Sequence, residues 1–121
     1  MIHCLHGAVG SFRAWETLSQ ELNESVNALD LWRLFDCSTP TLFEAGRIIS
    51  EGAEFGDLIL GYSMGGRLAL HALTAAPEKW RAAIIVSAHP GLVSGQQERR
   101  EEDREWASLS RGNWTSFLDQ W

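Results

Sequence analysis

Residues 57–69 read DLILGYSMGGRLA, and the fold class follows from how this stretch is organised. The apolar run 57–60 predicts a short strand. The alanine- and leucine-rich segment 67–76 predicts a helix, which Pro77 ends. Between them lies Gly61-x-Ser63-x-Gly65. A G-x-S-x-G pattern between a strand and a helix is typical of a nucleophile elbow.

The spacing of the elbow has a physical reason. The turn strains the backbone of Ser63, and a Cβ atom at Gly61 or Gly65 would clash with the neighbouring strand and helix. Ser63 is therefore the candidate catalytic residue, with its hydroxyl at the carboxyl edge of the sheet. The Met64 amide can stabilise a developing oxyanion at the same place. The alternative is a glycine-rich turn that carries an idle serine.

Apolar runs of strand length alternate with segments of helical spacing on both sides of this stretch. Such alternation indicates an α/β fold in which helices cover both faces of a parallel sheet. The strands are predicted at 1–5, 26–31, 57–60 and 82–87, and the helices at 12–23, 42–50 and 67–76. Ser11 is a possible N-cap of the first of these helices.

The character of the chain changes after His89-Pro90-Gly91. Residues 96–105 are dominated by arginine and acidic side chains, and an aromatic segment follows them. We interpret 91–121 as two helices of a different layer from 1–90. The last helix carries an apolar stripe at i, i+3, i+4 and i+7, which requires a covering surface. The stripe consists of Trp114, Phe117, Leu118 and Trp121.

The composition is that of a soluble globular domain, with 121 residues of which 45% are hydrophobic and 21% charged. A formal net charge of −6 argues against a nucleic-acid or anionic-membrane partner. No apolar stretch approaches the roughly 20 residues of a membrane helix, and the first residues do not resemble a signal peptide. Cys4 and Cys37 lack metal-ligand spacing and are expected to be free thiols. These features predict a cytoplasmic protein.

A second candidate feature, His6-Gly7-Ala8, follows the first strand directly. In a fold with a nucleophile elbow this loop lies beside the elbow, and it can lend a second amide to the oxyanion hole. We expect that amide to be the one of Ala8. The side chain of His6 is expected to organise the loop by bonding to the backbone.

Three motifs together resemble the α/β-hydrolase superfamily: His6-Gly7 near the start, the GYSMGG elbow and SAHPGL after the last strand. The HPGL run with the arginine-rich segment 98–106 is more particular. It is similar to the SHCHC synthase family (2-succinyl-6-hydroxy-2,4-cyclohexadiene-1-carboxylate synthases). The resemblance covers nearly the whole chain but only the N-terminal half of a family member. It implies that 1–90 form the N-terminal half of an α/β-hydrolase core and 91–121 the beginning of a helical cap.

The resemblance also implies a lyase of menaquinone biosynthesis, which abstracts a proton and eliminates pyruvate without a metal or organic cofactor. Ser63, activated by a His–Asp pair, would take the proton. Forked guanidinium groups suit a small-molecule substrate with several carboxylates. For Arg99 a surface i,i+4 pair with Asp103 is the alternative. The substrate-binding residues that match the family pattern are Tyr62, Arg67, Arg99 and Trp121.

The sequence departs from the family pattern in two places. Superfamily members carry D-x-P-G-x-G after the second strand, whereas residues 30–35 read DLWRLF, so this loop must take another path. An Asp or Glu and then a His should follow Ser63, but His71 and His89 both precede Asp103. We therefore expect an incomplete fragment, nearly inactive alone, that a missing C-terminal half or a complementing chain completes.

Two other functions remain open. An esterase, thioesterase or carbon–carbon bond hydrolase of the same fold would use the same elbow without needing Arg67 and Arg99 at the pocket. A non-catalytic binding module would explain both the missing triad partners and the tryptophan stripe.

Overall fold

The computed structural model describes residues 1–35 and 41–121 of the chain, and Cys37 lies outside the described residues. The chain divides into two units, Met1–Pro90 and Gly91–Trp121. Within the described ranges, no helix combines the length and the apolar character that crossing a membrane requires.

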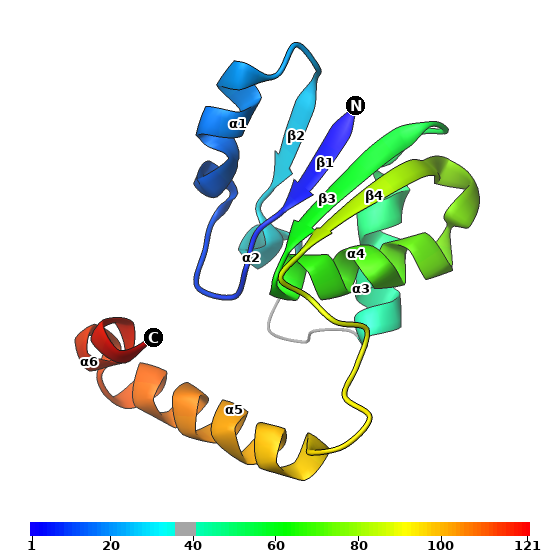
Figure 1. The fold of residues 1–121 in the computed structure, drawn as a ribbon. Helices are drawn as coiled ribbons and strands as arrows, with labels where there is room; N and C mark the ends of the chain where they lie inside the picture. Colours follow the sequence, from blue (N-terminus) through cyan, green and yellow to red (C-terminus); the bar gives the residue numbers. More distant parts are fainter. Residues whose placement is uncertain (36–40) are drawn as a thin grey trace. The chain divides into compact units, whose positions relative to one another are not determined.

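The first unit is built on a four-stranded sheet in the order β2-β1-β3-β4, and every pair of neighbouring strands is parallel (Figure 1). The strands are β1 (Ile2–Leu5), β2 (Val26–Leu29), β3 (Asp57–Tyr62) and β4 (Trp80–Val86). All four predicted strands are present, which confirms the α/β fold class. The second strand was predicted to reach Leu31, but Leu31 is the first residue of a short helix, because the Asp30 side chain caps that helix.

The helices of the first unit are η1 (Phe12–Trp15), α1 (Glu16–Glu21), α2 (Leu31–Leu34), α3 (Leu42–Glu51), α4 (Met64–Ala75) and η2 (Pro77–Lys79). The segment predicted as one helix over 12–23 begins as a 3₁₀ turn, and its α-helical part ends at Glu21. Ser11 is the N-cap residue of η1, with an extended backbone, but its side chain makes no cap bond. The start of α3 has instead a complete capping box between Thr41 and Glu44.

The core lies between the sheet and the helices α3 and α4, which also pack on each other. The two helices approach closely at Gly46, where a Cβ atom would lie 2.5 Å from the backbone carbon of His71. Only glycine fits at such a contact. The buried core residues are Leu5, Leu31, Ala45, Ile49, Ala53, Ile59, Leu68, Ala69, Ala72 and Trp80.

The other face of the sheet is covered unevenly. Strand alternation places Cys4, Leu60 and Ile84 side by side on this face, because the three are register partners on β1, β3 and β4. Cys4 is fully buried, whereas Ile84 is 53% exposed and Val86 is 41% exposed. The element η1 packs against β1 and β2. The apolar surface of β4 is therefore open, and β4 is also an edge strand among the described residues.

The second unit consists of α5 (Gln96–Gly112) and α6 (Trp114–Gln120), which pack on each other. Trp106 of α5 contacts Phe117 of α6 and Trp121, the residue after α6, edge to face, with ring centroids 5.9 Å and 5.3 Å apart. Phe117 is buried, but Trp114 and Trp121 stay more than half exposed. The apolar stripe predicted from the sequence is thus covered in part, by Trp106. The interpretation of this unit as the start of a cap remains a prediction.

Candidate active site

The backbone of Ser63 has the strained geometry expected of a nucleophile elbow. Its φ of 53° and ψ of −115° lie in a region that L-residues rarely adopt. The strain is held in place by the residues around it. The Ser63 amide donates to the Val86 carbonyl at 2.9 Å, and the Ser63 carbonyl accepts from the Arg67 amide at 3.1 Å. Ser63 thus joins the end of β3 to the start of α4, which begins at Met64.

The two glycines of the motif lie where no side chain fits. A Cβ atom at Gly61 would lie 2.4 Å from the Gly65 carbonyl oxygen, at the start of α4. A Cβ atom at Gly65 would lie 2.3 Å from the Leu5 carbonyl oxygen, on β1. Both distances are far below van der Waals contact with backbone atoms that cannot move aside. The predicted clash with the neighbouring strand and helix is confirmed.

The loop after β1 lies directly beside this elbow. A Cβ atom at Gly7 would be 3.1 Å from Tyr62 Cδ1 and 3.6 Å from Ser63 Cβ. Gly7 therefore permits the close approach of the loop to the serine. Ala8, the next residue, is exposed. The assignment of the Ala8 and Met64 amides to an oxyanion hole stays a prediction.

The side chain of His6 organises this loop, as the sequence predicted. It is buried, and its Nε2 accepts a hydrogen bond from the Leu31 amide at 3.2 Å. That bond leaves the ring proton on Nδ1, which donates to the Gly7 carbonyl oxygen at 2.8 Å. Both ring nitrogens are therefore used by the backbone, and His6 is not available as a base for Ser63.

The predicted substrate-binding residues fall into two groups. Tyr62 and Arg67 belong to the elbow itself, at the last position of β3 and one turn into α4. No carboxylate within 1–35 and 41–121 lies at ion-pair distance from Arg67. Arg99 and Trp121 belong to the second unit, so their part in this site remains a prediction. Arg99 Nε donates to Asp103 Oδ1 at 2.8 Å, which is the surface pair named above as the alternative.

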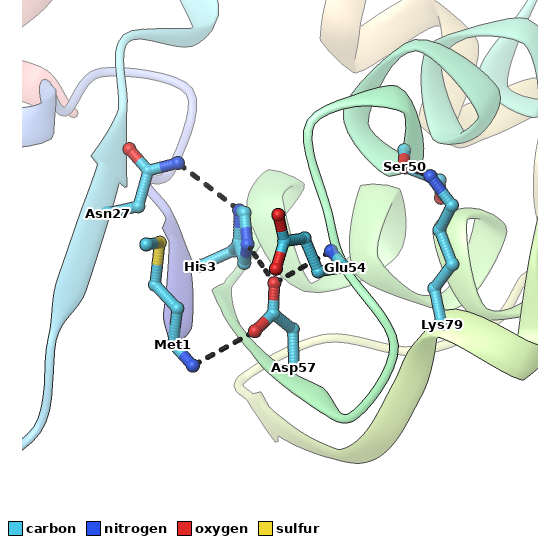
Figure 2. A network of polar contacts seen from close by, with 7 residues as sticks. All are labelled: Met1, His3, Asn27, Ser50, Glu54, Asp57 and Lys79. Atoms are coloured by element: carbon cyan, nitrogen blue, oxygen red, sulfur yellow. Dashed lines mark hydrogen bonds and ion pairs between the residues drawn. The ribbon is translucent and has the colours of Figure 1, made fainter.

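A buried His–Asp pair occurs at the opposite end of the sheet, and sequence reasoning missed it. Figure 2 shows the Asp57 carboxylate between the Met1 ammonium and the His3 imidazole, each at 2.9 Å. The Glu54 amide donates to the same carboxylate at 2.9 Å, and Asn27 lies 3.3 Å from the other nitrogen of His3. The available signals were a histidine inside the apolar run IHCL and an aspartate at the head of DLIL.

This pair cannot serve as the base for Ser63. Asp57 begins β3 and Ser63 follows its last residue, so the six intervening steps place them about 20 Å apart. Within the described part of the chain, no histidine is hydrogen-bonded to Ser63. The activation of Ser63 by a His–Asp pair stays a prediction.

The pKa shifts of the Cys4 thiol and the Asp57 carboxyl group fit structural roles. Burial raises the pKa of the Cys4 thiol to about 11, so the thiol is protonated and unreactive at neutral pH. Burial would also raise the pKa of Asp57. The bonds from the Glu54 amide, the terminal ammonium and His3 outweigh that effect and hold the pKa well below its usual range.

Comparison with curated proteins gives relatives that share one name. A Bacillus subtilis protein named as a 2-succinyl-6-hydroxy-2,4-cyclohexadiene-1-carboxylate synthase is 31% identical in an alignment that covers 98% of this chain and 48% of the relative. The chain resembles the N-terminal half of SHCHC synthases. The SHCHC synthase of Pectobacterium atrosepticum is also 31% identical, over 89% of this chain and 47% of its own length. That of Klebsiella pneumoniae is 38% identical over 55 residues.

The chain spans about half the length of the curated SHCHC synthases that it matches over most of its own residues. No family model matches the chain. The resemblance therefore covers the stretch of this chain that holds the elbow and the loop beside it.

Proposed function

We propose that the chain is the nucleophile-bearing half of an SHCHC-synthase-like lyase, which abstracts a proton and eliminates pyruvate from a small carboxylate substrate. The observation that supports this most strongly is the backbone of Ser63, strained at a φ of 53° and enclosed by glycines that admit no Cβ atom. Strain of this kind persists where it serves a site. The relatives named SHCHC synthases supply the reaction class.

In this proposal Ser63 takes the proton from the substrate, and the backbone amides of Ala8 and Met64 stabilise the negative charge that develops. The amide of Met64 is the first of α4, so the partial positive charge of that helix terminus adds to the stabilisation. No metal or organic cofactor takes part. A serine hydroxyl is a weak base unless an adjacent histidine accepts its proton, so a His–Asp pair must come from outside the described residues.

Arg67 is the proposed partner of a substrate carboxylate. Its place one turn into α4 keeps it near Ser63, and the absence of a carboxylate partner among the described residues leaves its guanidinium group available for a ligand. Tyr62 would line the pocket, since its side chain is 47% exposed and adjoins the loop at Gly7. Arg99 and Trp121 of the second unit would complete the substrate contacts.

We further propose that the chain acts only together with further polypeptide, either a C-terminal half or a complementing chain. The match to about half of each relative supports this, and so does the open surface of β4 at Ile84 and Val86. An exposed apolar edge strand is an unstable arrangement for a finished sheet. Alone, the 121 residues would be nearly inactive, because loss of a triad partner costs several powers of ten in rate.

The test is an assay of the complete gene product for pyruvate release from the SHCHC precursor. Ser63→Ala should lower kcat by about 10⁴-fold or more, whereas Ser19→Ala, an exposed serine on α1, should leave it unchanged. Intact mass compared with the reading frame shows whether the chain is longer than 121 residues.

Each alternative function has its own outcome in this assay. Hydrolysis of a neutral ester with no pyruvate from the SHCHC precursor would replace the lyase by an esterase of the same fold. No turnover of either substrate would favour a non-catalytic binding module, to which the exposed Trp114 and Trp121 point.

A further inference from the structure

The segment after β2 forms the short helix α2, so it departs from the glycine-rich loop of the superfamily pattern, as its sequence predicted. Asp30 Oδ1 accepts hydrogen bonds from the amides of Trp32 at 3.2 Å and Arg33 at 3.3 Å, and this cap starts α2. In place of a glycine-rich loop, the chain therefore has a single helical turn. That turn brings Leu31 and Trp32 to the loop that follows β1.

Two bonds connect α2 with that loop. The Leu31 amide donates to Nε2 of the buried His6, and the Trp32 indole Nε1 donates to the Gly10 carbonyl oxygen at 2.9 Å. The indole also lies against the His6 ring, with centroids 5.4 Å apart. Contacts from α2 thus reach the loop at His6 and at Gly10.

The loop has few bonds of its own between these two points. The Gly10 amide donates to the Gly7 carbonyl oxygen at 3.0 Å, which closes a turn with Ala8 and Val9 at its tip. Gly7 adjoins the Ser63 side chain. A turn held by one internal bond and containing two glycines would move readily, so its direction depends on the contacts outside it.

We propose that Trp32 is a positioning residue, which fixes the Gly7–Gly10 turn so that the Ala8 amide keeps a constant direction beside Ser63. This inference rests on the proposed function, in which that amide binds the oxyanion. A donor to an oxyanion acts only when it is held within a few tenths of an ångström of the required place. Trp32 is 53% exposed, so burial of its ring is a weak account of its role, whereas its Nε1–H bond to Gly10 is specific.

The variant that isolates this bond is Trp32→Phe. Phenylalanine keeps an aromatic ring beside His6, although a smaller one, and lacks the indole N–H donor. Trp114→Phe is the matched control, because Trp114 is equally exposed and lies in α6, outside the turn. Amide hydrogen exchange is measured at Gly10, whose N–H closes the turn, and amide ¹⁵N relaxation is measured at Ala8.

We expect exchange at Gly10 to become about fivefold faster in Trp32→Phe, as the loss of one hydrogen bond predicts, and to stay unchanged in Trp114→Phe. In the complete enzyme, Trp32→Phe should lower kcat for pyruvate release about tenfold with KM unchanged, because an oxyanion donor acts in the transition state. A purely structural role would lower the melting temperature without this separation of kcat from KM.

The outcomes separate this inference from the proposed function. Unchanged exchange at Gly10, or an unchanged kcat in an active enzyme, overturns the role of Trp32. If exchange at Gly10 is faster in Trp32→Phe but the wild-type protein releases no pyruvate, the link from Trp32 to the turn is supported and the proposed lyase is overturned.

Discussion

The two ends of the sheet differ in backbone strain and in how many hydrogen-bond partners their polar groups have. At the amino end, Asp57 receives donors from Met1, His3 and the Glu54 amide, and no strain is needed to bring them together. At the carboxyl end, Ser63 has a positive φ, closely packed glycine neighbours and, in the part of the chain that the structure describes, no histidine partner. Among the described residues, a buried His–Asp pair thus lies at one end, and the candidate serine, to which no histidine is hydrogen-bonded, lies at the other.

Residue type alone does not assign a role at either end of the sheet. His3 and Asp57 have the chemistry of a catalytic pair, but their burial at the start of the strands makes them a stabilising contact. In a parallel α/β sheet, ligands bind beyond the carboxyl ends of the strands. The end of the sheet at which a polar group lies therefore distinguishes a structural contact from a candidate site. A substitution can disrupt either end without changing residues at the other.

The largest effect is expected when Gly65→Ala disrupts the packing at the carboxyl end of the sheet. The new Cβ atom would lie 2.3 Å from the Leu5 carbonyl oxygen, so β1 or α4 must shift. We expect the free energy of unfolding to fall by about 4 kcal/mol, measured by urea denaturation followed by circular dichroism.

Gly52→Ala is the matched control for that change. Gly52 lies at the end of α3 with a φ of −83°, and a Cβ atom there meets nothing within 4 Å. We expect a stability change of less than about 1 kcal/mol, in the stabilising direction, because alanine restricts the unfolded chain. Equal losses in both variants would show that Gly65 has no special constraint.

A smaller loss is expected from breaking the amino end with Asp57→Asn. The amide cannot neutralise the Met1 ammonium or accept the same set of bonds, and His3 stays buried beside it. Because the side chain of Met1 is 47% exposed, this contact is only part-buried, and we expect a loss of about 2 kcal/mol, which urea denaturation at pH 7 would detect.

The pH dependence of stability in wild type and in Asp57→Asn provides the control for this prediction. Its pKa is held below the value of an unfolded aspartate, so its contribution to stability is complete above that value, about pH 4. The contribution decreases as the pH falls below 4 toward the low pKa of the folded state. The stability difference between wild type and Asp57→Asn should therefore shrink below pH 4; a constant difference would contradict a charge-based role.

Much of this fold could be predicted from the sequence. The four strands and the elbow follow from patterns within a few residues, and the requirement for Gly61 and Gly65 follows from the geometry of any such turn. The end of β2 was misplaced because Leu31 is as apolar as the strand before it. Only the bonds of the Asp30 side chain show that the helix begins there.

The His3–Asp57 pair could not be predicted because it depends on register. The two residues are 54 positions apart and meet only since β1 and β3 are parallel neighbours, with Ile2 opposite Leu58. The bond from Trp32 to Gly10 depends in the same way on the position of α2 beside the loop after β1. Local patterns give elements and close turns, whereas contacts between distant side chains require the sheet order.

The smallest effect is expected from Ser63→Gly. Glycine adopts a positive φ without penalty, so this change should release the strain at Ser63, offset in part by the greater freedom of glycine in the unfolded chain. We expect a net stabilisation of about 1 kcal/mol. Ser63→Ala is the control, since it removes the hydroxyl but keeps the Cβ atom and its strain. If Ser63→Gly is no more stable than Ser63→Ala, the backbone at this end of the sheet stores no strain, and backbone strain no longer supports a functional role for Ser63.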